Sequence, residues 1–191
     1  MPAKTRVLFI AEAPPLSADR YFYFENVERG DWLWIALMKA FYGPEWKGTK
    51  EERERKPYWL RRFQSDGFFL IDAVKEPISG SSRKRIARIS SDASRLISEV
   101  KKIDPRQIIL IKNSVCRALF QRFKDDGLPV INDGPLPFPA LGQATKFADG
   151  FRKLMPQIRS ALEKGRDFDL CFHPVEIRGE PLSATILRER R

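Results

Sequence analysis

The feature that most constrains this chain is a short apolar run that ends at a carboxylate and two prolines. Residues 7–11 read Val-Leu-Phe-Ile-Ala, and Glu12, Ala13, Pro14 and Pro15 follow. A run this short, with branched and aromatic side chains, is typical of a central parallel strand, and proline cannot continue a hydrogen-bonded ladder. Because ligands bind at the carboxyl ends of such strands, we predict that Glu12 lies in a pocket. The alternative is a solvated loop residue that follows a core strand.

Strand-like and helix-like segments alternate along the chain. We predict four strands, at residues 7–11, 67–73, 107–111 and 128–131. Helical spacing of apolar residues predicts four main helices, at residues 32–42, 83–103, 113–123 and 145–164. Asp31 is a good cap for the first helix, Ser81 or Ser82 for the second, and Asn113 or Ser114 for the third. This order predicts an α/β fold, a three-layer α/β/α sandwich with a central four-stranded parallel sheet, in which Glu12 and Asp72 share one edge.

The length of 191 residues suits a single domain that spans residues 1–191. Residues 43–66 lose the periodic pattern and contain a run of charged residues. We therefore expect a surface insertion there, with a short helix around residues 51–56. Residues 165–191 are predicted to form a C-terminal extension.

The composition limits the classes of function. The chain has 35 Lys and Arg against 25 Asp and Glu, a formal charge of +10, which favours a polyanionic partner such as nucleic acid. The chain has two distant cysteines and a single histidine, His173. These numbers argue against a disulfide framework, a metal site and a histidine-based triad, so we expect no metal or cofactor. No apolar segment is long enough for a membrane span or a signal core. We expect a cytoplasmic monomer with no membrane partner.

The order of these segments resembles the uracil-DNA glycosylase superfamily over roughly residues 5–163. Ala-Glu-Ala-Pro-Pro at residues 11–15 is similar to the family's first motif, which is usually Gly-Glu-Ala-Pro-Gly in the thermostable and iron–sulfur branches. Phe-Phe-Leu-Ile-Asp-Ala-Val-Lys-Glu-Pro at residues 68–77 is similar to the family's segment ending in Thr-Asn-Val-Val-Lys-Cys-Pro-Pro. A third strand with its helix, and a proline-rich loop before the last helix, follow in family order.

The resemblance implies the uracil-DNA glycosylase fold and a role for each matching residue. Glu12 would position or activate the water that attacks the sugar C1′. Phe22 or Phe24, ahead of the two neighbouring tyrosines, would stack on the extruded base. Asp72 would read the base edge, where the family usually has Asn. An ionised Asp only accepts hydrogen bonds, so it would prefer a base that presents N–H donors over uracil.

The proline-rich loop departs from the family pattern. The family carries His-Pro-Ser there, whereas this chain has Leu136, Pro137, Phe138 and Pro139. Without the histidine, the site lacks a donor to the departing base, a role typically worth a few kcal/mol. Leu136 or Phe138 would fill the gap that an extruded base leaves in the stack. The four cysteine ligands of the iron–sulfur branch are absent, so we assign no cluster.

Three functional hypotheses follow. The first is a monofunctional DNA glycosylase that excises a damaged or deaminated base in DNA repair, with Arg83, Lys84 and Arg85 holding phosphates of the DNA. The second is a catalytically inactive nucleic-acid-binding module of the same fold, which the missing histidine and the change from Asn to Asp favour. The third is a pocket for a free nucleobase or nucleotide. His173 is left out of the site in all three.

Overall fold

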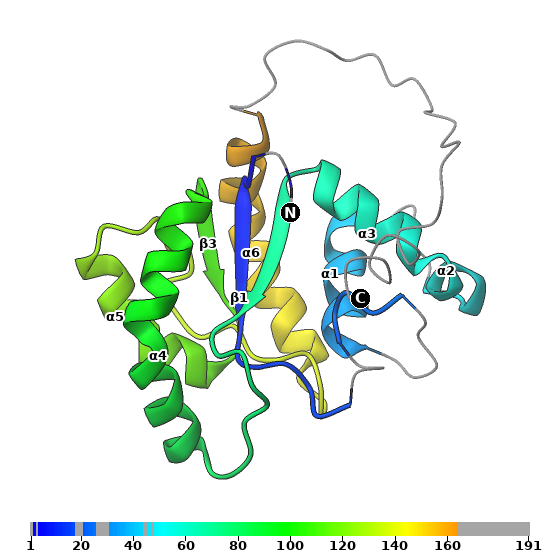
Figure 1. The fold of residues 1–191 in the computed structure, drawn as a ribbon. Helices are drawn as coiled ribbons and strands as arrows, with labels where there is room; N and C mark the ends of the chain where they lie inside the picture. The colour runs from blue at the N-terminus through cyan, green and yellow to red at the C-terminus, as the bar shows by residue number, and fades with distance from the viewer. Residues whose placement is uncertain are drawn as a thin grey trace, which may run out of the picture.

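The sheet has three parallel strands, and β1 is central. The computed structural model describes residues 2, 4–17, 21–25, 31–43, 46 and 48–163, so the predicted extension at residues 165–191, including His173, lies outside the described residues. The strands are β1 (Val7–Ala11), β2 (Phe68–Asp72) and β3 (Gln107–Leu110), in the order β2-β1-β3. They run downward in Figure 1. All five residues of β1 are buried, as expected for an apolar run without alternation.

The prediction of a four-stranded sheet is wrong for the described residues. Residues 128–131 make one isolated parallel bridge to β3, and Leu136 makes another just beyond the end of β3. Between the bridges, the Asn132 side chain takes the place of a strand. Its Nδ2 donates to the Leu110 carbonyl at 3.0 Å, and its Oδ1 accepts from the Leu110 N–H at 2.9 Å. One amide therefore satisfies backbone groups that a continuous fourth strand would otherwise pair.

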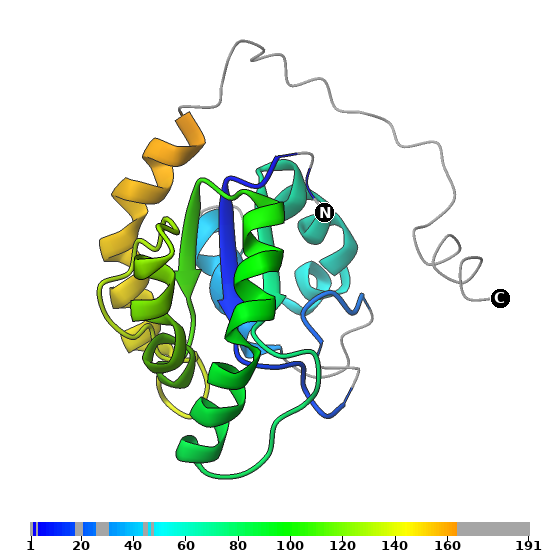
Figure 2. The same ribbon diagram turned by 60° about the vertical axis from the view of Figure 1, so that its left-hand side comes forward.

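Helices cover both faces of the sheet. They are α1 (Trp32–Tyr42), α2 (Lys50–Glu54), α3 (Lys56–Ser65), α4 (Ser82–Ile103), α5 (Asn113–Asp125) and α6 (Ala144–Glu163). Alternate residues of β1 enter two separate cores: Phe9 packs with α1, α3 and α6, whereas Ile10 packs with α4 and α5. Figures 1 and 2 show helices on both sides of the sheet, so the predicted α/β layering is confirmed. None of the described helices has the length and apolar character needed to cross a membrane.

Two of the three predicted helix caps are confirmed, and the third is wrong, because the residue before α5 is Lys112 and its side chain makes no cap hydrogen bond. The Asp31 carboxylate accepts hydrogen bonds from the backbone N–H groups of Leu33 and Trp34, both at 3.1 Å, at the start of α1. The Ser81 hydroxyl accepts from the Lys84 N–H at the start of α4. Both side chains thereby satisfy N–H groups that have no partner within the helix.

The surface insertion predicted for residues 43–66 is wrong, because this segment supplies part of the core. The expected short helix is present as α2, but α3 follows it and places Trp59 and Phe63 in the core, 4% and 1% exposed. Lys56 is fully buried and pairs with Asp31 at 3.5 Å. The charged sequence obscured this helix, because a few apolar side chains on one face give only a weak periodic signal.

Candidate functional site

A cavity of about 300 Å³ opens at the carboxyl ends of the strands. Its charged and aromatic lining residues are Glu12, Tyr21, Phe22, Asp31, Asp72, Arg85, Lys112 and Phe138. The structure thus brings both predicted carboxylates, Glu12 and Asp72, into one pocket. The volume falls at the lower end of the range for small-molecule sites. The pocket also lies beside β1, where the chain order of the sheet reverses, which is the usual ligand position in open α/β sheets.

Glu12 is a buried carboxylate that receives three donors. Arg85 Nη1 donates to Oε2 at 2.6 Å, Lys112 Nζ donates to the same oxygen, and Ser114 Oγ donates to Oε1 at 2.5 Å. Burial alone would raise the pKa of Glu12, but the hydrogen bonds from Lys112 and Ser114 and the charges of Lys112 and Arg85 outweigh it and lower the pKa below its ordinary value. Glu12 is therefore ionised at neutral pH.

Lys112 lies in a strained turn between β3 and α5. Its φ of 85° and ψ of 141° fall in a region that costs a residue other than glycine about 1–3 kcal/mol. The backbone is held on both sides: the Lys112 N–H donates to the Leu136 carbonyl at 2.7 Å, and the Lys112 carbonyl accepts from the Cys116 N–H at 3.1 Å. The turn brings the Lys112 side chain onto Glu12. Backbone strain that is held in place by surrounding contacts is common at functional sites.

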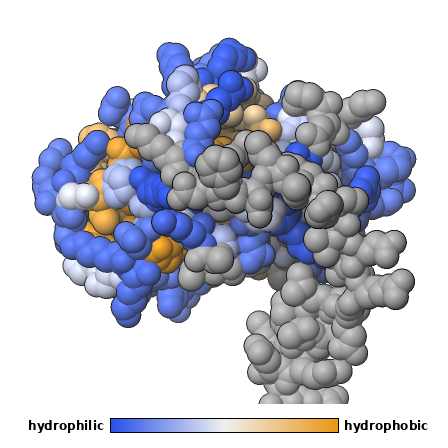
Figure 3. Space-filling view, turned by 90° about the horizontal axis from the view of Figure 1, so that it is seen from above, coloured by the Kyte–Doolittle hydropathy of each residue, from blue (hydrophilic) through white to orange (hydrophobic). Residues whose placement is uncertain are grey.

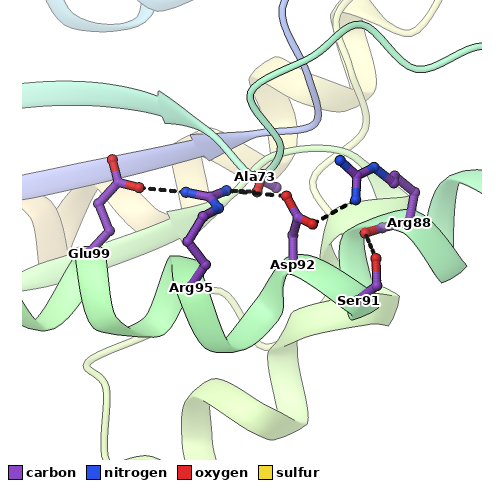
Figure 4. A network of polar contacts seen from close by, with 6 residues as sticks. All are labelled: Ala73, Arg88, Ser91, Asp92, Arg95 and Glu99. Carbon is purple, nitrogen blue, oxygen red and sulfur yellow. Dashed lines mark hydrogen bonds and ion pairs between the residues drawn. The ribbon is translucent and has the colours of Figure 1, made fainter.

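Arg85 comes from α4, and a polar network ties α4 to the end of β2 (Figure 4). Arg95 donates to the Ala73 carbonyl at 2.8 Å, and Ala73 directly follows β2. The same guanidinium pairs with Glu99 at 2.6 Å and with Asp92 at 3.6 Å. These contacts fix α4 against the edge of the sheet at which the pocket opens, and so position Arg85.

Asp72 has surroundings unlike those of Glu12. It is the last residue of β2 and lies opposite Ala11 in the parallel register. Among the described residues, no hydrogen bond or ion pair reaches its carboxylate. Burial raises the pKa of Asp72 to about 6, so part of the population is protonated near neutral pH. One pocket thus contains an ionised carboxylate and a partly protonated one.

The aromatic run at residues 21–24 is divided between the pocket and other contacts. Phe22 lines the pocket and is only 5% exposed, so it is largely a wall of the core. Phe24 is not among the lining residues, whereas Tyr21, which was the less favoured residue, is. The Tyr23 hydroxyl donates to the Leu70 carbonyl at 3.0 Å and accepts from the Leu70 N–H at 2.8 Å. This exchange pairs the edge of β2 and holds the aromatic run over the pocket.

The residues predicted to contact DNA are not all on the surface. Arg83 and Lys84 are exposed in the first turn of α4, as that prediction requires. Arg85 instead turns inward, where it binds Glu12 and donates to the Gly80 carbonyl at 3.0 Å. The inward position follows from the ionised Glu12, which attracts the nearest guanidinium.

The two residues predicted to fill the base stack also separate. Phe138 lines the pocket and is partly exposed. Leu136 is 3% exposed and packs over Gly150, where an added Cβ would lie 2.8 Å from Leu136 Cδ1. The structure therefore places Leu136 in the core, and its side chain is not at the surface.

Sequence reasoning did not assign Lys112 and Ser114 to the site. The available signal was their position directly after the apolar run at residues 107–111, which ends at the same edge of the sheet as Glu12. No family model and no curated protein sequence matches this chain. Within the described part of the chain, no three or more His, Cys, Asp or Glu residues form a group that could hold a metal ion.

Proposed function

We propose that this protein hydrolyses the N-glycosidic bond of a nucleobase that enters the pocket at the carboxyl end of the sheet. The observation that carries the proposal is the pair of unlike carboxylates, because the pKa of Glu12 is lowered and that of Asp72 is raised to about 6. Groups whose surroundings separate their pKa values in this way are typical of sites that use an acid and a base. Hydrolysis of glycosidic bonds by two carboxyl groups is a common solution.

In the proposed reaction, the bond between C1′ and the base nitrogen breaks, and its electron pair leaves with the base. Protonated Asp72 donates its proton to the departing base. Glu12 orients a water molecule whose oxygen bonds to the electron-deficient C1′, and it accepts the proton that this water loses. A carboxylate of low pKa is an adequate acceptor, because water bound to a cationic carbon is strongly acidic. Proton transfer from Glu12 to Asp72 through solvent restores the site.

The walls of the pocket suit a flat, polar ligand. Tyr21, Phe22 and Phe138 contribute aromatic surface, and bases extruded from nucleic acid are commonly held between such rings. Exposed Arg83 and Lys84 can neutralise phosphates of the same strand. The formal charge of +10 is consistent with a polyanionic substrate.

The resemblance to the uracil-DNA glycosylase superfamily supports the cleaved bond and the role of Glu12, which falls in the first motif. The family usually has Asn, a residue that reads the base edge, at the position of Asp72, so the role of Asp72 as an acid is argued from its surroundings alone. An ionised Asp72 would prefer a base that presents N–H donors. Because burial raises the pKa of Asp72 to about 6, the protonated form must also be considered. A protonated Asp has an O–H donor beside an acceptor oxygen, so like the Asn of the family it can both donate and accept hydrogen bonds. Below about pH 6, the pocket can therefore also accept a base with a carbonyl and an adjacent N–H.

The direct test is base release under single-turnover conditions at low salt. The substrates are single- and double-stranded oligonucleotides that carry uracil, hypoxanthine, xanthine or alkylated bases. We expect Glu12→Gln and Asp72→Asn each to lower the rate by about 10²–10⁴-fold, the usual contribution of an acid or base. The wild-type rate should fall as the pH rises above about 6, because Asp72 loses its proton.

Asp149→Asn is the matched control, because it neutralises a carboxylate in an exposed pair on α6. Thermal unfolding of each variant establishes that it is folded at the assay temperature. Base release by both pocket variants at the wild-type rate would contradict the proposed mechanism.

The three donors to Glu12 favour one second candidate, a nucleic-acid-binding module without catalysis. Both carboxylate oxygens already accept hydrogen bonds, which leaves fewer positions for water and weakens the carboxylate as a base. Salt-dependent oligonucleotide binding without release of any base, by a folded wild-type protein, would support this candidate over the enzyme.

A further inference from the structure

A second cavity, of about 520 Å³, lies at the opposite end of the sheet, where the strands begin. Its lining residues include Lys4, Arg6, Arg61 and Arg106, and none of its described lining residues is acidic. Figure 3 views the molecule from this end, and its described surface is mostly hydrophilic, with small apolar patches. We call these four residues the amino-end basic cluster. A concave site with four cations and no carboxylate among its described lining residues is suited to an anion.

Two of the four guanidinium and ammonium groups are held in place by α6. Arg106 Nη1 donates to the Ala161 carbonyl at 3.2 Å, and Arg6 Nη1 approaches the Leu162 carbonyl at 3.5 Å. These carbonyls are in the last turn of α6, where backbone acceptors have no partner within the helix. The neutral Ala161 carbonyl orients the Arg106 guanidinium without cancelling its full charge. The cluster is therefore partly ordered before any ligand binds.

Gly67 gives the cluster its shape. Its φ is 84°, and a Cβ there would lie 2.7 Å from Cγ of Arg6, so the Arg6 stem lies directly against this glycine. The Arg6 N–H also donates to the Gly67 carbonyl at 2.8 Å. Arg61 enters from α3, just before the turn at Gly67. Three separate parts of the chain thus deliver their cations to one cavity.

We propose that the amino-end basic cluster binds phosphate groups of a ligand that carries two or more of them. Arginine presents paired N–H donors that match phosphate oxygens, and three of the four cations are arginines. The five residues of β1 separate this cavity from the pocket at Glu12 by roughly 17 Å, at about 3.3 Å per residue, so one nucleotide cannot occupy both. The cluster is a second site, and it does not depend on the proposed reaction.

The two sources of such phosphates are a free polyphosphate and the backbone of a nucleic acid. The test measures binding of inorganic tripolyphosphate by calorimetry, and binding of an undamaged DNA duplex by fluorescence anisotropy, to the full chain at low salt. The test variant is Lys4→Gln with Arg61→Gln, because both side chains are exposed. The matched control is Lys102→Gln with Arg117→Gln, which removes two exposed charges from α4 and α5.

We expect the test variant to lose at least about tenfold more affinity than the control, since hydrogen bonds to charged groups are each worth about that factor. A loss for tripolyphosphate with duplex binding equal to the control assigns the cluster to free polyphosphates. A loss for the duplex assigns it to nucleic-acid backbone, and its dependence on salt should then become less steep. Equal losses in the test and control variants for both ligands would overturn the proposal, because only overall charge would then matter.

Discussion

Replacement of Asp72 by Asn should make the protein more stable at neutral pH, although it removes a carboxylate from the candidate site. Burial raises the pKa of Asp72 from 3.8 to about 6, so the folded protein binds this proton more tightly than the unfolded chain does. The stability contributed by Asp72 therefore falls as the pH rises from about 3.8 to about 6. Because Asn cannot ionise, the Asp72→Asn variant does not lose this stability as the pH rises.

The size of the effect follows from the pKa of Asp72. A tenfold change in proton binding corresponds to about 1.4 kcal/mol, so a rise from 3.8 to about 6 corresponds to as much as about 3 kcal/mol. Asp72 is only partly buried, and solvent reduces the penalty, so we expect a gain of about 1–3 kcal/mol at pH 7. For a chain of this length, that gain raises Tm by roughly 2–12 °C.

The assay is chemical and thermal unfolding of wild type, Asp72→Asn and the surface control Asp149→Asn between pH 3.5 and pH 8. The stability difference between wild type and Asp72→Asn should grow from near zero below pH 4 to its full value above pH 6. The control should differ from wild type by less than about 1 kcal/mol at every pH. A variant at position 72 that is less stable than wild type at pH 7, or a difference that does not change with pH, would refute the argument that Asp72 is unpartnered and desolvated.

Three other substitutions test contacts in the structure by unfolding measurements. Glu12→Gln should be less stable than wild type by about 2–3 kcal/mol at pH 7, because it leaves two cations without their carboxylate. This difference in stability should begin to shrink as the pH falls below about 4.5, where the unfolded chain takes up the proton, and should vanish once folded Glu12, whose pKa is lower, is also protonated. Lys56→Met should lower the free energy of unfolding by about 3–5 kcal/mol, because it leaves Asp31 buried without its cation. Adding Asp31→Asn should recover part of this loss, and no recovery would argue against the ion pair. Asn132→Ala should cost about 2–4 kcal/mol, because the buried N–H and carbonyl of Leu110 lose their partners, and faster amide hydrogen exchange at Leu110 would locate the effect.

The local chemistry of the sequence was sufficient to predict most of the elements. The apolar run ending at Glu12 predicted β1 and its position at the edge of a pocket, because a buried strand needs no partner information to be recognised. Asp31, and the pair Ser81 and Ser82, identified two helix starts, since a cap acts on N–H groups only a few residues away; the structure assigns the second cap to Ser81. The shared edge of Glu12 and Asp72 followed from the parallel order alone.

The failed predictions concern contacts between residues far apart in the chain. Asn132 replaces part of a fourth strand because its amide happens to reach Leu110, and a sequence pattern does not contain that distance. Leu136 leaves the surface because Gly150, on a different element, makes room for it. The apolar face of α3 emerges from a charged segment only when the sheet is present to cover it.

The sequence by itself therefore determined that this chain forms α/β layers and carries two carboxylates at the ends of neighbouring strands. Only the tertiary structure decided the ionisation state of each carboxylate. Arg85 on α4, Lys112 in the turn after β3 and Ser114 on α5 converge on Glu12 and keep it ionised. Asp72 receives no such donor within the described residues and becomes a weaker acid. The physical reason is that desolvation and Coulomb interactions depend on what surrounds a group in space, and the order of residues along the chain does not specify those neighbours.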